Sequence, residues 1–139
     1  MKIKPIRIVF ESFDDFFARA RRQIQEAVET RKRFIQPKDL RVWSSVEGYQ
    51  QFMNDQKYSI LAVIYKYQPK SVYQLAKILN RAQQNVARDC DLLAGRRFIK
   101  FVSSKKGRKN KAPRLSFDYN AVEVHLPSVT YKIEFEKVS

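Results

Sequence analysis

Four polar side chains near one predicted helix have the clearest chemistry in this sequence. A helix that closes at Gly95 and turns Val86, Cys90 and Leu93 inward leaves the polar side chains of the same segment pointing outward, because each residue rotates a helix by about 100°. Arginine pairs with guanine edges, and asparagine and glutamine pair with adenine edges. A merely solvated helix face would be equally polar. The residues expected to read DNA bases are Arg81, Gln84, Asn85 and Arg88.

This helix is the second of a pair joined by a tight turn. Ser71 followed by Gln74 is a capping box, which predicts the start of the first helix. Asn80 readily takes the left-handed conformation that ends a helix sharply. Because Ala82 is a poor N-cap, we expect Asn80 with Gln83 to cap the second helix. The inward face of the first helix is predicted to consist of Val72, Leu75, Ala76 and Leu79.

A strongly basic loop follows the helix pair. Residues 98–102 and 115–119 read as two short strands, and Gly107 and Pro113 between them favour turns. The order helix, turn, helix, strand, basic loop, strand is that of a winged helix-turn-helix, and a cationic hairpin tip suits phosphates or a narrow minor groove. The alternative is a charge run that only aids solubility. The cations are Lys105, Lys106, Arg108, Lys109, Lys111 and Arg114.

Residues 71–119 resemble the MarR-like winged-helix regulators of prokaryotes. Residues 1–127 are similar to a group of small DNA-binding proteins within that class, and the segments LAKILNRAQQNVARDCDLLAGRRFI and VEVHLP carry the likeness. The resemblance implies an N-terminal strand and long helix, then a winged domain that binds DNA, then a terminal strand. Some such proteins are encoded beside toxins and act as antitoxins or autorepressors. This chain departs from the pattern in its more basic wing and in its tail after Pro127.

The N-terminal segment predicts a strand and a long amphipathic helix. Ile6, Ile8 and Phe10 alternate with other side chains, and Ser12 with Asp15 resembles a capping box. The apolar stripe of the helix must be buried on the winged domain or on a second subunit. Its arginines either extend a DNA-facing surface or are solvated. The residues expected to form a dimer interface are Phe13, Phe16, Phe17, Ile24 and Val28.

The rest of the chain predicts further strands and helices around a hinge near Pro37. Residues 40–43 read as a strand, 45–53 as a helix, and Asn54 as the cap of another helix. Two alternating runs predict strands at 122–126 and 129–138. We therefore expect an N-terminal strand and helix that form a dimerisation arm (residues 1–36), a winged helix-turn-helix DNA-binding domain (37–127) and a C-terminal strand or tail (128–139). The fold class is α+β, mainly helical.

Composition narrows the possible functions. The 139 residues carry a net charge of +14, which predicts attraction to DNA, RNA or an acidic membrane surface. No apolar run approaches the ~20 residues of a membrane span, and no signal peptide is evident, so we expect a cytoplasmic protein. The single cysteine, Cys90, reads as a small core residue.

Enzymatic chemistry has little support in the sequence. One histidine, His125, and one cysteine cannot build a structural zinc site. Glycine occurs only at positions 48, 95 and 107, which excludes a Gly-rich phosphate loop. Asp89 and Asp91 are expected to pair with nearby arginines. We expect no enzymatic activity, no cofactor and no metal.

The sequence therefore predicts a homodimeric, sequence-specific regulator of transcription that binds double-stranded DNA, as a repressor. Two alternatives remain. One is an antitoxin-type interaction protein that neutralises a toxin or other partner protein and regulates its own gene. The other is an RNA-binding protein whose wing grips a structured RNA, although the aromatic motifs of the common RNA-binding sheet are absent.

Overall fold

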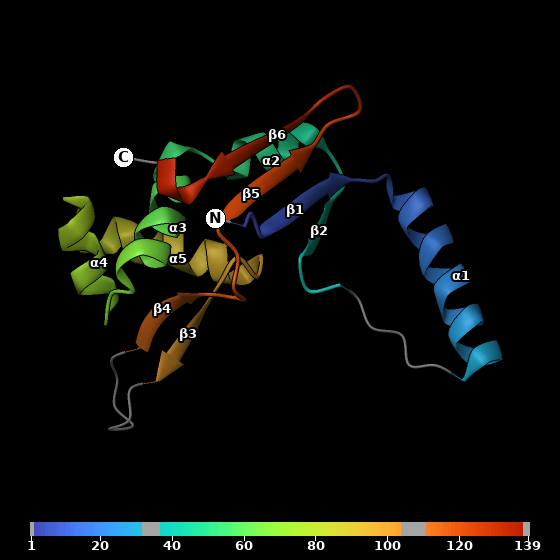
Figure 1. Ribbon diagram of the computed structural model, residues 1–139, viewed down its shortest axis with the longest axis horizontal. Coiled ribbons are helices and arrows are strands. Elements are labelled where there is room, and N and C mark those ends of the chain that lie inside the picture. The colour runs from blue at the N-terminus through green and yellow to red at the C-terminus, as the bar shows by residue number, and fades with distance from the viewer. Residues whose placement is uncertain (1, 32–36, 104–110, 138–139) are drawn as a thin grey trace.

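The structure, a computed structural model, describes residues 2–31, 37–103 and 111–137. Within these residues the chain forms a mixed α+β fold with α-helices, a four-stranded sheet and a separate two-stranded hairpin (Figure 1). The α+β class is as expected.

The four-stranded sheet has the order β2-β1-β5-β6. Its strands are β1 (Pro5–Phe10), β2 (Leu40–Trp43), β5 (Ala121–His125) and β6 (Thr130–Glu134). β1 runs parallel to both β2 and β5, and β5 pairs with β6 in antiparallel fashion. The sheet thus joins segments from both ends of the chain.

β1 does not belong to a separate N-terminal arm, as the predicted fold had placed it. It lies between β2 and β5, and its Ile6 and Ile8 side chains are fully buried in the same core as those of the helices. Its two edges pair with distant segments, which satisfies its backbone N–H and C=O groups inside the fold, while Ile6 and Ile8 on one face are buried in the core. The expected boundary at residue 36 lies outside the described residues.

Four helices share one hydrophobic core with the sheet. They are α2 (Val46–Phe52), α3 (Asp55–Tyr67), α4 (Val72–Leu79) and α5 (Gln83–Gly95). α2 contacts β2, while α3, α4 and α5 pack against one another and against the hairpin. The predicted caps of α3 and α4 are confirmed, since Asn54 and Ser71 each accept a hydrogen bond from an amide three residues on. The largest fully buried aliphatic residues of this helical part of the core are Ile60, Leu61, Ile64, Leu75, Val86 and Leu93.

The hairpin consists of β3 (Ile99–Ser103) and β4 (Lys111–Leu115), paired antiparallel. Its second strand begins four residues earlier than the predicted strand at 115–119. Pro113, which was expected to favour a turn, is instead buried within β4 and pairs with Phe101 of β3. A proline is accommodated because β4 has a pairing partner on one side only, so its missing N–H costs no ladder hydrogen bond.

The end of the chain also differs from the prediction. The alternating run at 129–138 forms a strand only as far as Glu134, and a 3₁₀ turn, η1 (Phe135–Lys137), follows. The turn brings the fully buried Phe135 ring within 5.7 Å of the Tyr119 ring centroid. Burial of the Phe135 side chain in the core is therefore favoured over continuation of β6 beyond Glu134.

α1 (Phe13–Thr30) stands away from the rest of the molecule (Figure 1). Ser12 caps it as predicted, but none of its residues is buried. The expected apolar stripe is instead largely exposed, at 67% for Phe13, 53% for Phe17 and 73% for Val28. Within the described part of the chain, no helix combines the length and apolarity that crossing a lipid bilayer requires.

Candidate nucleic-acid interface

α4 and α5 are joined by a sharp turn at residues 80–82. Asn80 is left-handed, with φ 56° and ψ 48°, and its amide donates to carbonyls of α4. This confirms the expected end of α4. The predicted capping of α5 by Asn80 is wrong, because that residue is used in closing α4. Ala82 is the N-cap of α5 and makes no side-chain capping hydrogen bond.

α5 ends differently from the prediction that placed Gly95 just beyond it. Gly95 is the last residue of the helix, and the left-handed residue is Arg97, with φ 63°. The amide of Phe98 donates to the carbonyl of Leu93 over 3.0 Å, and Phe98 is fully buried. A left-handed residue followed by a buried apolar residue is a Schellman-type ending, in which the packing of Phe98 outweighs the backbone preference for glycine.

The outward face of α5 carries three of the four residues expected to read bases. Gln84 and Arg88 are exposed and Asn85 is half-buried at the edge of the same face. Nη2 of Arg88 donates to Oδ1 of Asn85 over 3.3 Å, so these two side chains already lie together. The opposite face is fully buried, as predicted, through Val86, Cys90 and Leu93.

Arg81 lies apart from these three residues. Its Nη2 is 2.9 Å from Oδ2 of Asp89, which confirms the expected pairing of that carboxylate with an arginine. The second Asp89 oxygen is 3.9 Å from Nζ of Lys57, and Lys57 and Asp89 are both buried. The guanidinium of Arg81 therefore packs inside the protein, where it holds the turn against α5 and α3.

The hairpin beside α5 carries cations on its described part. Lys111 is exposed at the start of β4, and Lys100 is exposed on β3. Arg114 is half-buried, and its Nη1 donates to the carbonyls of Pro69, over 2.6 Å, and Pro113. Arg114 thus anchors the hairpin to the segment before α4. The remaining predicted wing residues, Lys105, Lys106, Arg108 and Lys109, lie outside the described residues.

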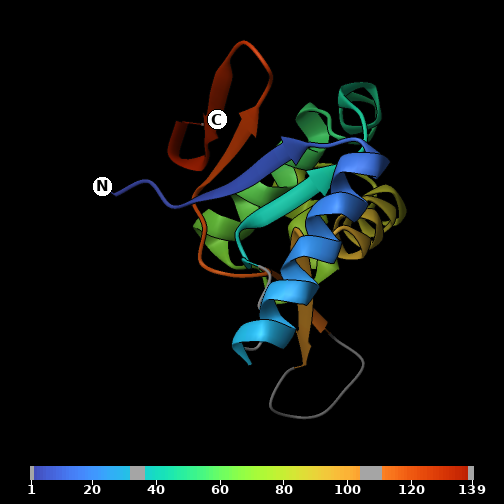
Figure 2. The same ribbon diagram turned by 90° about the vertical axis from the view of Figure 1, so that its right-hand side faces the viewer.

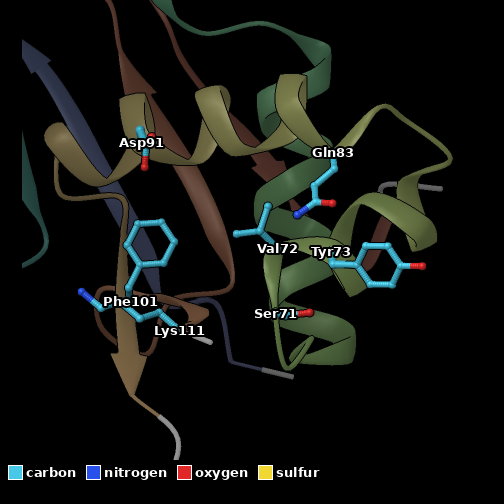
Figure 3. Close-up of a pocket in the computed structure, with 7 residues that line it drawn as sticks. All are labelled: Ser71, Val72, Tyr73, Gln83, Asp91, Phe101 and Lys111. Carbon is cyan, nitrogen blue, oxygen red and sulfur yellow. The ribbon is translucent and has the colours of Figure 1, made fainter. Parts of the chain in front are cut away.

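A pocket of about 610 Å³ lies between α4, α5 and the hairpin (Figure 3). Gln83 and Asp91 line it from α5, Tyr73 from α4, and Phe101 from β3. Sequence reasoning missed these residues, and it expected Asp91 to pair with an arginine. The spacing of Gln83 and Asp91 could have indicated them, because residues eight positions apart lie on the same side of a helix.

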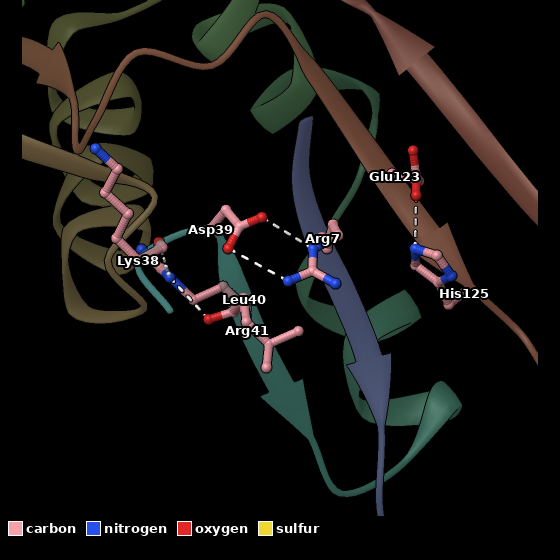
Figure 4. A network of polar contacts seen from close by, with 7 residues as sticks. All are labelled: Arg7, Lys38, Asp39, Leu40, Arg41, Glu123 and His125. Atoms are coloured by element: carbon pink, nitrogen blue, oxygen red, sulfur yellow. Dashed lines mark hydrogen bonds and ion pairs between the residues drawn. The ribbon is translucent and has the colours of Figure 1, made fainter. Parts of the chain in front are cut away.

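Other reactive side chains lie away from this surface. Cys90 is buried as expected, and desolvation raises the pKa of its thiol to about 12. His125 lies on β5, where its Nε2 is 2.7 Å from Oε1 of Glu123 (Figure 4). Among residues 2–31, 37–103 and 111–137, three or more histidine, cysteine, aspartate or glutamate residues do not come together in a way that would hold a metal ion.

Residues 52–124, slightly more than half of the chain, match the model of the HVO_A0114 family. The chain belongs to the HVO_A0114 family. No curated protein and no solved structure matches it. The HVO_A0114 match runs from the last residue of α2 into β5, so it includes α5 and both hairpin strands. It leaves β1, α1 and β2 outside.

Proposed function

We propose that this protein is a sequence-specific regulator of transcription that binds double-stranded DNA as a MarR-like winged helix-turn-helix. In this proposal α4 and α5 are the helix-turn-helix, and β3 and β4 are the wing. The observation that carries it is the exposed polar face of α5, with Gln84, Asn85 and Arg88 together, next to a two-stranded hairpin with exposed Lys100 and Lys111.

The base-reading residues would be Gln84, Asn85 and Arg88. α5 presents their side chains without a competing ion pair to an acidic residue in the described structure. Glutamine and asparagine suit adenine, and arginine suits guanine. Asp91, on the flank of the same helix, offers a carboxylate that suits the amino group of cytosine. Arg81 is left out of this set because its guanidinium is engaged by Asp89.

The hairpin would bind the DNA backbone. Lys111 and Lys100 are exposed on its two strands, and the sequence between the strands adds the cationic residues Lys105, Lys106, Arg108 and Lys109. Each cation that neutralises a phosphate releases a counterion, which makes binding depend strongly on salt. The net charge of +14 supplies the long-range attraction to the same polyanion.

Two copies would bind one operator. Winged-helix dimers place two reading helices about 34 Å apart, one turn of DNA, and so double the contact with a palindromic site. The exposed stripe of α1 supports a dimer, because exposure of Phe13, Phe17, Ile24 and Val28 in one helix is costly in water. Occlusion of a promoter would then make the protein a repressor.

The deciding experiment is selection of binding sites from a random duplex library, followed by competition with RNA. We expect enrichment of a palindromic sequence and specific binding that an excess of structured RNA does not displace. Recovery of no common sequence, together with tighter binding to RNA than to any duplex, would contradict the proposal and favour the RNA-binding alternative.

A further inference from the structure

α1 connects two neighbouring parallel strands without covering the sheet. β1 and β2 pair in parallel, and a crossover helix between such strands ordinarily packs its apolar face on the sheet. In this structure the apolar face of α1 is exposed instead, from Phe13 to Val28. The apolar face of α1 is therefore not packed against the sheet, and α1 does not cover the face of the sheet next to it.

The uncovered part of the sheet forms one wall of a groove of about 760 Å³ beside α1. Leu40 and Val42 of β2 line it, on the side of the strand opposite the buried Trp43. Ile99 and Phe101 of β3 continue the apolar lining, and Phe16 lies at its edge on α1. Figure 2 shows α1 passing along this side of the molecule. The groove is an apolar surface with room for further side chains.

The rim of this groove is basic. Lys38, Arg97 and Lys100 are exposed along it, and the residues of the described chain that line it include no acidic one. Arg41 donates to the carbonyls of Lys38 and Leu40 (Figure 4) and to that of Arg97, each over 2.8 Å, and so fixes the position of the rim. An occupant of this groove must present apolar side chains together with negative charge.

The first turns of α1 have that composition. Phe13 and Phe17 are more than half exposed; the exposed Asp14 lies next to them on the helix surface, and the exposed Asp15 follows on the far side of the same turn. Among the described residues, neither carboxylate makes an ion pair with a basic side chain. In a chain of net charge +14, this acidic and aromatic segment is the complement of the basic, apolar groove.

The groove of the same copy does not accept this segment in the present arrangement. Glu11, directly after β1, accepts two hydrogen bonds from the Arg19 guanidinium, at 3.0 Å and 2.9 Å, and Ser12 caps the helix. These contacts fix how α1 is turned relative to β1. With that orientation only Phe16 reaches the groove, while Phe13 and Phe17 point into solvent.

We infer that the groove is the docking site for α1 of a second copy of this chain. In each half of a two-fold dimer, Phe13 and Phe17 of one copy lie on Leu40, Val42 and Phe101 of the other. Asp14 meets Lys38 and Lys100 across the interface, and Asp15, turned to the far side of α1, adds negative charge at this end of the helix. The inference rests on the proposed homodimer and specifies its interface, and its test needs no DNA.

The test is a charge exchange, read as the dimer dissociation constant by analytical ultracentrifugation. Asp14→Lys with Asp15→Lys, and separately Lys38→Glu with Lys100→Glu, should each weaken the dimer about tenfold or more, since like charges then face each other. The chain that carries all four changes should regain most of the affinity. That rescue separates the interface from damage to α1, because the changes at Lys38 and Lys100 cannot repair the helix.

A matched control reverses two exposed acidic residues outside the segment, Glu26→Lys and Glu136→Lys. This control changes the net charge by the same amount and should leave the dimer intact. A monomeric wild-type protein at high micromolar concentration, or loss of the dimer in both charge variants without rescue in the combined one, would overturn the inference.

Cross-linking tells which copy supplies the helix. An equimolar mixture of a Phe17→Cys chain and a Leu40→Cys chain should form a disulfide between the two chains under oxidation. If only the single chain with both changes forms the link, internally and as a monomer, α1 folds onto its own groove and the inference is wrong. DNA binding by such a monomer would leave the proposed function standing while this interface fails.

Discussion

Arg81 and Asp89 join the turn before α5 to the middle of that helix, with 2.9 Å between Nη2 of the arginine and Oδ2 of the aspartate. Lys57 of α3 approaches the second carboxylate oxygen at 3.9 Å. One buried carboxylate thus faces two cations from different elements. The geometry of the helix pair therefore depends on an ionic cluster as well as on apolar packing.

Asp89→Asn should destabilise the protein strongly. The change leaves Lys57 and Arg81 with no negative partner in a buried site, and removal of one member of a buried pair costs about 3–5 kcal/mol. Urea unfolding would measure the loss. Asp91→Asn, on the exposed side of the same helix, is the control and should change stability by less than about 0.5 kcal/mol. Equal stability of the two variants would show that the cluster does not support the fold.

Gln84→Ala and Arg88→Ala should reduce specific DNA binding. Each loses hydrogen bonds to a base edge, which costs about 1–3 kcal/mol on the selected site and relaxes the preference at that position. Fluorescence anisotropy with the selected duplex and a scrambled one gives both quantities. Arg21→Ala, which removes one exposed arginine from α1, is the charge-matched control for Arg88→Ala. Full discrimination by both α5 variants would mean that another surface reads the sequence.

Replacement of Lys105, Lys106, Arg108 and Lys109 by alanine should weaken binding to all duplexes alike. Fewer counterions are then released, so the slope of log affinity against log salt should fall by roughly one for each phosphate that the loop no longer neutralises. A titration series at several salt concentrations measures it. A slope equal to that of the wild-type protein would show that the loop does not bind phosphates.

Arg114→Ala should act on stability more than on the salt dependence of binding. Its guanidinium donates to the carbonyls of Pro69 and Pro113, and a hydrogen bond from a charged group contributes about 1.5–3 kcal/mol. Lys111→Ala removes one cation from the same strand and is the control. We expect a lower melting temperature for the first variant and an unchanged one for the second. The reverse order would return Arg114 to the phosphate-binding set.

Cys90 should be unreactive in the folded protein. Burial raises the pKa of its thiol to about 12, and only the thiolate reacts with disulfide reagents, so reactive thiolate is scarce at all pH values below that. Ellman's reagent at pH 8 should react slowly with the native protein and at once with the protein in urea. Rapid modification under native conditions would reveal an opening of α5.

Local sequence patterns predicted the N-caps of α1, α3 and α4 and the inward face of α5, but not the cap of α5 or the exposure of the apolar stripe of α1. Ser71, Asn54 and Ser12 accept hydrogen bonds from amides three residues ahead, as their side chains and positions indicated. Patterns were less successful at element ends. The prediction for Gly95 failed because burial of Phe98 placed the left-handed residue at Arg97 instead.

The roles of single charged residues were decided by the tertiary structure. Arg81 and Arg88 look alike in the sequence, seven residues apart. One faces a buried carboxylate and the other faces solvent, because the chain enters α5 through a turn that lies against α3. Likewise, Arg114 reaches a carbonyl 45 residues away. Patterns of neighbouring residues cannot predict contacts between side chains and carbonyls so far apart in the sequence.

Helix periodicity, capping and net charge depend on neighbouring residues or on composition, so the approximate positions of most elements and the charge of +14 could be predicted from the amino-acid order alone. The central position of β1 between β2 and β5, and the crossover of α1 between parallel strands that it does not cover, become apparent only in the folded chain. Sheet order depends on pairings between distant segments, and the cost of closing those long loops is recovered only when the whole core forms.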